Sequence, residues 1–146
     1  MNAAAPHLAL GIAGALSALA ALLHLAIILG GAPWYRFFGA GERMARLAEA
    51  GHAQPALITL GIAVVLLVWA GYAWAAGGWV PALRGLPALR WGLLLITAVY
   101  LLRGLAPLIL GLGGLPLTPF LLWSSAICLG FGLVHLLGLV QRWSLL

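Results

Sequence analysis

A single arginine lies inside a stretch that is long enough to cross a lipid bilayer. Arg103 belongs to residues 91–112, which hold no other charged residue. A charge in hydrocarbon costs about 2.5–3.5 kcal/mol on insertion scales, so such residues usually face other protein groups and mark function. Arginine cannot lose its proton to avoid this cost. We therefore expect other groups to solvate Arg103 and a functional site to lie around it.

The chemistry of this site depends on what compensates the guanidinium charge. The chain contains only two acidic residues, Glu42 and Glu49. Glu42 follows a Gly-Ala-Gly bend at residues 39–41 that can turn the chain inward, so a Glu42–Arg103 pair is the first expectation. The alternatives are backbone carbonyls freed by Pro107, which interrupts the helical hydrogen-bond ladder, and a bound anion or lipid headgroup.

Depth along the helices, at about 1.5 Å per residue, brings further polar side chains to the same half of the membrane as Arg103. The predicted ligand-binding residues are Arg103, Tyr100, Trp34, Tyr35, Thr59, Ser124 and Ser125. Glu42 and His24 are the candidates for proton transfer, although a helix backbone can equally satisfy His24. His135 is expected nearer the opposite face, paired with a backbone carbonyl or with Tyr72.

Composition places the chain in the membrane. Of its 146 residues 65% are apolar and only 6% are charged, whereas soluble domains carry about 25% charged residues. The net charge of +5 comes from arginines scattered at loop edges, which anchor helices and do not suggest nucleic-acid binding. One cysteine, Cys128, excludes an intrachain disulfide, and we predict no metal site. The sequence identifies no cofactor.

Four apolar stretches of about 20 residues predict membrane-spanning helices. They cover residues 8–29, 55–76, 91–112 and 120–140, so we expect an all-α bundle of four transmembrane helices in one domain, 1–146. A short turn at 113–119 predicts that the last two helices are antiparallel neighbours. The first loop is rich in aromatic residues and then favours helix, which predicts an interfacial segment at about 33–51.

The arginines do not specify an orientation in the membrane. Each side is expected to carry three: Arg84, Arg90 and Arg142 with the chain ends, and Arg36, Arg43 and Arg46 with the first loop. Such a balance is compatible with insertion in both directions.

The first loop also carries a resemblance. The run Tyr35-Arg36-Phe37-Phe38-Gly39-Ala40-Gly41-Glu42, placed before a helix that begins at Pro55, resembles uncharacterised small bacterial four-helix membrane proteins. It is more loosely similar to the DoxX-like group, which has an aromatic and glycine-rich stretch and a glutamate before its second helix. The resemblance implies four transmembrane helices in a bacterial cytoplasmic (inner) membrane and no particular activity.

Three functions fit these observations. The first is a pocket around Arg103 that binds a small molecule or a membrane lipid, with proton transfer by Glu42 or His24 as an added activity. The second is a small channel or transporter that works as a homo-oligomer, which the balanced arginines favour. The third is an accessory subunit of a larger membrane complex, which the glycine-rich helix faces favour.

Overall fold

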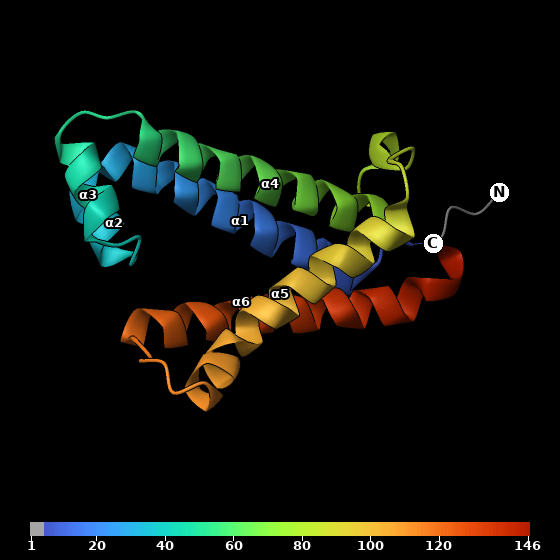
Figure 1. Ribbon diagram of the computed structural model, residues 1–146. Coiled ribbons are helices and arrows are strands. Elements are labelled where there is room, and N and C mark those ends of the chain that lie inside the picture. Colours follow the sequence, from blue (N-terminus) through green and yellow to red (C-terminus); the bar gives the residue numbers. More distant parts are fainter. Residues whose placement is uncertain (1–4) are drawn as a thin grey trace. The chain divides into compact units, whose positions relative to one another are not determined.

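The computed structural model describes residues 5–146, and every regular element in that range is helical. The elements are α1 (Leu8–Gly30), α2 (Ala32–Phe37), α3 (Glu42–Glu49), α4 (Gln54–Gly77), the 3-10 helix η1 (Pro81–Leu83), α5 (Leu89–Leu112), α6 (Pro119–Arg142) and the 3-10 helix η2 (Trp143–Leu145). Helices α1, α4, α5 and α6 are long and apolar enough to cross a membrane (Figure 1). The chain is therefore an all-α integral membrane protein.

The four predicted spans are confirmed, and their ends shift by no more than two residues. Proline explains why two of the helices begin where they do. Pro55 follows the first residue of α4, and Pro119 opens α6, where the missing N–H costs nothing. The Thr118 hydroxyl caps α6 by accepting a hydrogen bond from the Leu121 N–H at 3.1 Å.

The chain divides into two compact units. The first comprises Met1–Ser17, of which residues 5–17 are described, together with Trp69–Leu146. The second comprises Ala18–Val68. Helices α1 and α4 thus contribute one end to each unit. The expectation of a single domain stays a prediction.

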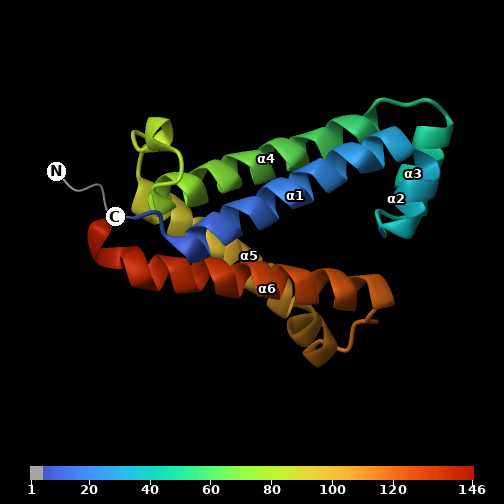
Figure 2. The same ribbon diagram turned by 180° about the vertical axis from the view of Figure 1, so that it is seen from behind.

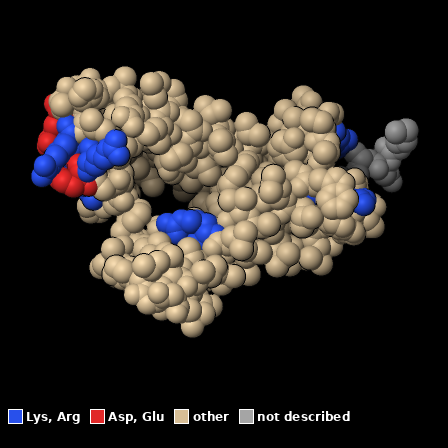
Figure 3. Space-filling view, in the orientation of Figure 1, with Lys and Arg blue, Asp and Glu red and all other residues tan. Residues whose placement is uncertain are grey.

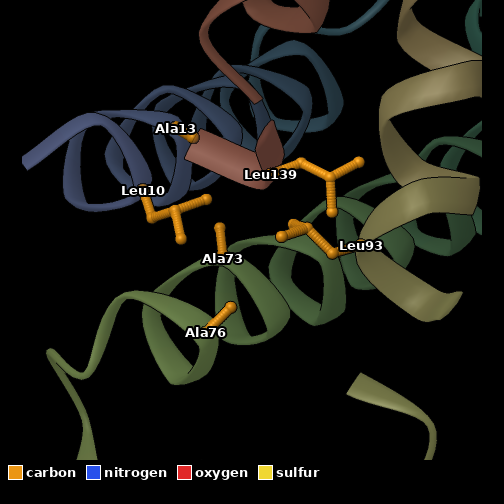
Figure 4. Packing of buried hydrophobic residues seen from close by; sticks show 6 residues of the cluster. All are labelled: Leu10, Ala13, Ala73, Ala76, Leu93 and Leu139. Atoms are coloured by element: carbon orange, nitrogen blue, oxygen red, sulfur yellow. The ribbon is translucent and has the colours of Figure 1, made fainter. Parts of the chain in front are cut away.

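The core of the first unit is made of small and branched apolar side chains from four helices. Leu10 and Ala13 of α1, Ala73 and Ala76 of α4, Leu93 of α5 and Leu139 of α6 form one buried cluster (Figure 4). Two tryptophans of this unit reach the start of α1. Trp74 donates its indole N–H to the Gly11 carbonyl at 3.2 Å, and Trp79 donates to the His7 carbonyl at 2.9 Å.

Helices α5 and α6 lie side by side in both ribbon views (Figures 1 and 2). A Cβ added at Gly104 would lie 2.7 Å from the Leu129 backbone, and one added at Gly132 would lie 2.7 Å from the Leu101 side chain. The residue number rises from 101 to 104 on α5 while that of its partner falls from 132 to 129 on α6, so the prediction of antiparallel neighbours is confirmed. At Gly104 the neighbouring backbone leaves no room for a side chain, whereas at Gly132 the Leu101 side chain would have to shift.

The second unit contains the predicted first-loop segment as a pair of short helices. The aromatic part forms α2 and the polar part forms α3, and the two helices pack together. Ala32 and Tyr35 of α2 and Ala45 of α3 form a buried cluster with Ile27 of α1. Gly41 lies in the turn between α2 and α3 and has a φ of 95°, a backbone conformation that other residues adopt only with strain. Charged side chains of both signs gather over α2 and α3 (Figure 3).

Candidate functional site

Arg103 is held by two neighbouring serines of the adjacent helix. Its Nη1 donates to the Ser125 hydroxyl at 2.5 Å, and its Nη2 donates to the Ser124 hydroxyl at 2.8 Å. The guanidinium is partly buried, whereas Ser125 is only 1% exposed. All three residues were predicted as ligand-binding from the sequence, and α5 and α6 bring them together. Both acceptors are neutral, so they solvate the cation without compensating its charge.

Two residues of α5 shape the backbone around Arg103. Gly104 lets α6 approach closely enough for the serines to reach the guanidinium. Pro107, inside α5, has no N–H for the Arg103 carbonyl one turn earlier. Gly104 therefore accounts for the close approach of the two helices, and Pro107 leaves a backbone acceptor on the residue that carries the charge.

The structure does not support the predicted Glu42–Arg103 pair, because Glu42 is engaged elsewhere. The Arg36 guanidinium contacts both Glu42 oxygens at 2.9 and 3.0 Å and both Glu49 oxygens at 2.7 and 3.0 Å. Arg46 adds a 3.1 Å contact to Glu42, which confirms the i,i+4 pair expected on α3. The physical reason is proximity: Arg36 lies just across the glycine turn and can hold both carboxylates with one planar fork.

This charge cluster predicts how α2 and α3 respond to acid. Hydrogen bonds from Arg36 lower the pKa of Glu42 to about 2, and they also lower the pKa of Glu49. A depressed folded-state pKa adds stability above the unfolded value, here about 4.5, and that stability is lost as the pH falls toward 2. We expect the backbone amides of α2 and α3 to lose hydrogen-exchange protection, corrected for intrinsic rates, across this pH window. The substitution Arg36→Gln should remove most of the dependence, and equal protection at pH 2.5 and 6 would contradict the prediction.

A second polar cluster lies within the first unit, and only one of its members was predicted as a site residue. The Tyr100 hydroxyl lies 3.0 Å from the Ser17 hydroxyl, and both residues are buried. The Tyr100 ring packs against the rings of Trp69, Phe131 and His135, with centroids 4.9, 5.6 and 5.0 Å away. Ser17 was not among the predicted site residues, and His135 was expected to pair with a backbone carbonyl or with Tyr72. Their positions in the sequence give no sign that both lie beside Tyr100.

His135 is fully buried and has one unused nitrogen. Its Nδ1 lies 2.8 Å from the Phe131 carbonyl, which can only accept, so Nδ1 carries the proton. This confirms the predicted backbone partner, whereas Tyr72, the alternative, donates to the Pro87 carbonyl at 3.2 Å. The His135 Nε2 is a buried acceptor with no partner among residues 5–146. In the same range, no three His, Cys, Asp or Glu side chains are grouped as metal ligands.

The remaining predicted residues lie in the second unit. Thr59 and Tyr35 are brought together, with their hydroxyls 3.3 Å apart, while the Thr59 hydroxyl also donates to the Pro55 carbonyl at 2.8 Å. Trp34 packs against Phe38, with ring centroids 5.8 Å apart. The Nδ1 of His24 lies 2.7 Å from the Ala20 carbonyl of its own helix, which is the backbone-satisfied alternative. The catalytic roles of Glu42 and His24 stay predictions.

Comparisons of the chain with protein-family models, with curated proteins and with solved structures find no match.

Proposed function

We propose that this membrane protein binds an oxyanion, such as a phosphate or carboxylate group, between α5 and α6 at Arg103, Ser124 and Ser125. The observation that carries the proposal is the distribution of charge. The chain has two acidic residues, and Arg36 and Arg46 hold both of them. Because the partners of Arg103 are neutral hydroxyls, an anion from outside the chain is the group that would balance its charge.

The hydrogen-bond donors at the site suit such an anion. A guanidinium has five N–H donors, and two of those on Arg103 are used by the serines. Ser124 accepts from Arg103 and donates to the Leu121 carbonyl at 3.3 Å. Ser125 also accepts from Arg103, and its hydroxyl proton has no acceptor within residues 5–146. Three guanidinium donors and one hydroxyl therefore remain, and oxyanions accept from guanidinium groups in paired, planar geometry.

The cost of placing the charge also supports a binding role. A guanidinium held by two hydroxyls is an expensive way to join helices in lipid, where model studies give about 1–2 kcal/mol for an interhelical hydrogen bond between polar side chains. Small residues such as Gly104 already allow close packing without a charge. Helix packing alone therefore does not explain why an arginine occupies position 103, whereas a bound anion does.

The finer location that we propose is a bacterial cytoplasmic membrane, and it rests on the resemblance of the first loop. Proton transfer by Glu42 or His24 is left outside the proposal, because a salt bridge engages the first and its own helix backbone engages the second.

The test is phosphate binding to lipid-depleted protein in detergent, measured by calorimetric titration. We expect Arg103→Gln to weaken inorganic phosphate binding about tenfold or more, because a hydrogen bond to a charged group contributes about 1.5–3 kcal/mol. Arg103→Lys should fall between, since it keeps the charge and loses the planar fork. Arg84→Gln removes one exposed positive charge from a loop and is the matched control. Equal phosphate affinity in wild type and Arg103→Gln would overturn the proposal.

A further inference from the structure

We infer that the oxyanion is the phosphate group of a membrane phospholipid, taken from the leaflet at the 113–118 end of α5 and α6. This inference rests on the proposed oxyanion site and names its occupant. It depends on the direction of the Arg103 side chain, on the depth of its guanidinium and on the surface around it.

The Arg103 side chain runs along the helices toward the loop that joins them. The contacts of Gly104 with Leu129 and of Gly132 with Leu101 place position 103 level with about residue 130 of α6. Ser124 and Ser125 lie five or six residues nearer the start of α6, which is about 8 Å along the axis. The guanidinium is therefore displaced from its own backbone toward the membrane surface, as in arginines that snorkel.

The depth of the guanidinium matches a phosphate drawn slightly into the bilayer. Helix α6 has 24 residues and a length of about 36 Å, which exceeds a hydrocarbon core of about 30 Å by about 3 Å at each end. The two serines lie about 8–9 Å from the first residue of α6, so the guanidinium lies about 5 Å inside the hydrocarbon boundary. Local thinning of the bilayer can accommodate a phosphate group at this depth at a modest free-energy cost.

The surface on either side of the site suits acyl chains. Leu102 and Leu108 of α5 are each 61% exposed, and Trp123, next to Ser124 on α6, is 74% exposed. Leucine side chains that face outward in a membrane contact lipid tails, and tryptophan is enriched where tails meet headgroups. A phospholipid can reach the partly buried guanidinium sideways through the bilayer. A soluble anion would have to leave water and pass this apolar surface.

The donor set also suits a phosphodiester. Its two unesterified oxygens can accept from the remaining N–H groups of Arg103 and from the Ser125 hydroxyl, and its single negative charge balances the guanidinium. The contact needs no further cation, and both groups would be neutralised where the dielectric constant is low.

The experiment compares lipid retention between variants. Wild type, Arg103→Gln and Arg84→Gln are extracted from the same membranes in a mild detergent, and bound phospholipid is counted by native mass spectrometry and by phosphorus assay. We expect wild type and Arg84→Gln to retain about one phospholipid per chain that Arg103→Gln loses. Short-chain dihexanoyl phosphatidylglycerol, a phosphodiester with one negative charge, should displace this lipid, and an equal concentration of diacylglycerol, which lacks phosphate, should not.

Two other results would overturn the inference in distinguishable ways. If all three proteins retain the same phospholipid while only Arg103→Gln loses inorganic phosphate binding, the occupant is a soluble oxyanion and the proposed function stands. If neither lipid retention nor phosphate binding depends on Arg103, both the inference and the proposed function are wrong. Circular dichroism and the elution volume of Arg103→Gln establish that a loss of lipid does not reflect unfolding.

Discussion

Replacement of Gly104 by leucine is expected to destabilise the protein by about 3 kcal/mol, the upper part of the range for overpacked cores. A Cβ at this position would lie 2.7 Å from the backbone N and Cα and the Cβ of Leu129. A backbone cannot move aside as a flexible side chain can, so the added leucine must push α5 and α6 apart. The separation also draws the Ser124 and Ser125 hydroxyls away from Arg103, and a partly buried guanidinium loses its acceptors.

A second glycine of the same helix pair provides the control. Gly130 of α6 is exposed, and a Cβ added there meets no atom within 4 Å. Gly130→Leu should therefore leave stability unchanged or raise it slightly, because leucine has the higher helix propensity. Unfolding of both variants is followed by circular dichroism in mixed micelles with increasing sodium dodecyl sulfate. The packing argument is wrong if Gly104→Leu and Gly130→Leu unfold at the same detergent fraction.

The amino-acid sequence predicted the membrane helices closely, because their signal is long and local. About 20 consecutive apolar residues bounded by proline, glycine or charge leave little freedom in where a span begins or ends. Two of the site contacts were also within reach. Ser124 and Ser125 follow a short turn after α5, and a short turn makes α5 and α6 antiparallel neighbours, so the serines were expected in the same half of the membrane as Arg103.

The partner of Glu42 could not be found by the same reasoning. Depth along a helix says how far a residue lies from the membrane surface, and it does not say which way a loop folds. The positive φ of Gly39 and Gly41 turns α3 back against α2, where Arg36 captures both carboxylates. The sequence contains this alternative as an arginine six residues before Glu42, but the intramembrane charge of Arg103 gave the competing pair more weight.

The cluster around Tyr100 was missed for a related reason. Ser17, Tyr100 and His135 come from three different helices. The Ser17 and Tyr100 hydroxyls and the Tyr100 and His135 rings meet only when each helix takes a definite rotation about its axis. Polar stripes show that a face is inward, but several rotations bury the same stripe. Helix rotation is decided by close contacts between helices such as Gly104 against Leu129, and the residue types along one helix do not specify which partner they meet.

The double substitution Ser124→Ala with Ser125→Ala is expected to destabilise the protein by about 3 kcal/mol. Each hydrogen bond to a charged group contributes about 1.5–3 kcal/mol, and a cation that loses its acceptors inside the protein keeps the cost of its desolvation. Alanine removes both hydroxyls without adding volume, so packing between α5 and α6 is preserved. Unfolding is measured in the same micelle titration, with Thr97→Ala, a buried hydroxyl that donates to its own helix at 2.7 Å, as the control.

The stronger form of this prediction uses Arg103→Met to remove the charge. If the serines matter because they solvate the guanidinium, their loss should cost little once the charge is absent, and the triple variant should recover most of the lost stability. Arg103→Met alone should be neutral or stabilising, because replacing a buried charge by an apolar side chain of similar length is often favourable. Additive effects of the arginine and serine changes would show that the hydroxyls act by packing alone. If Arg103→Met is more stable than wild type and yet loses the bound phosphate, then Arg103 serves binding at the expense of stability.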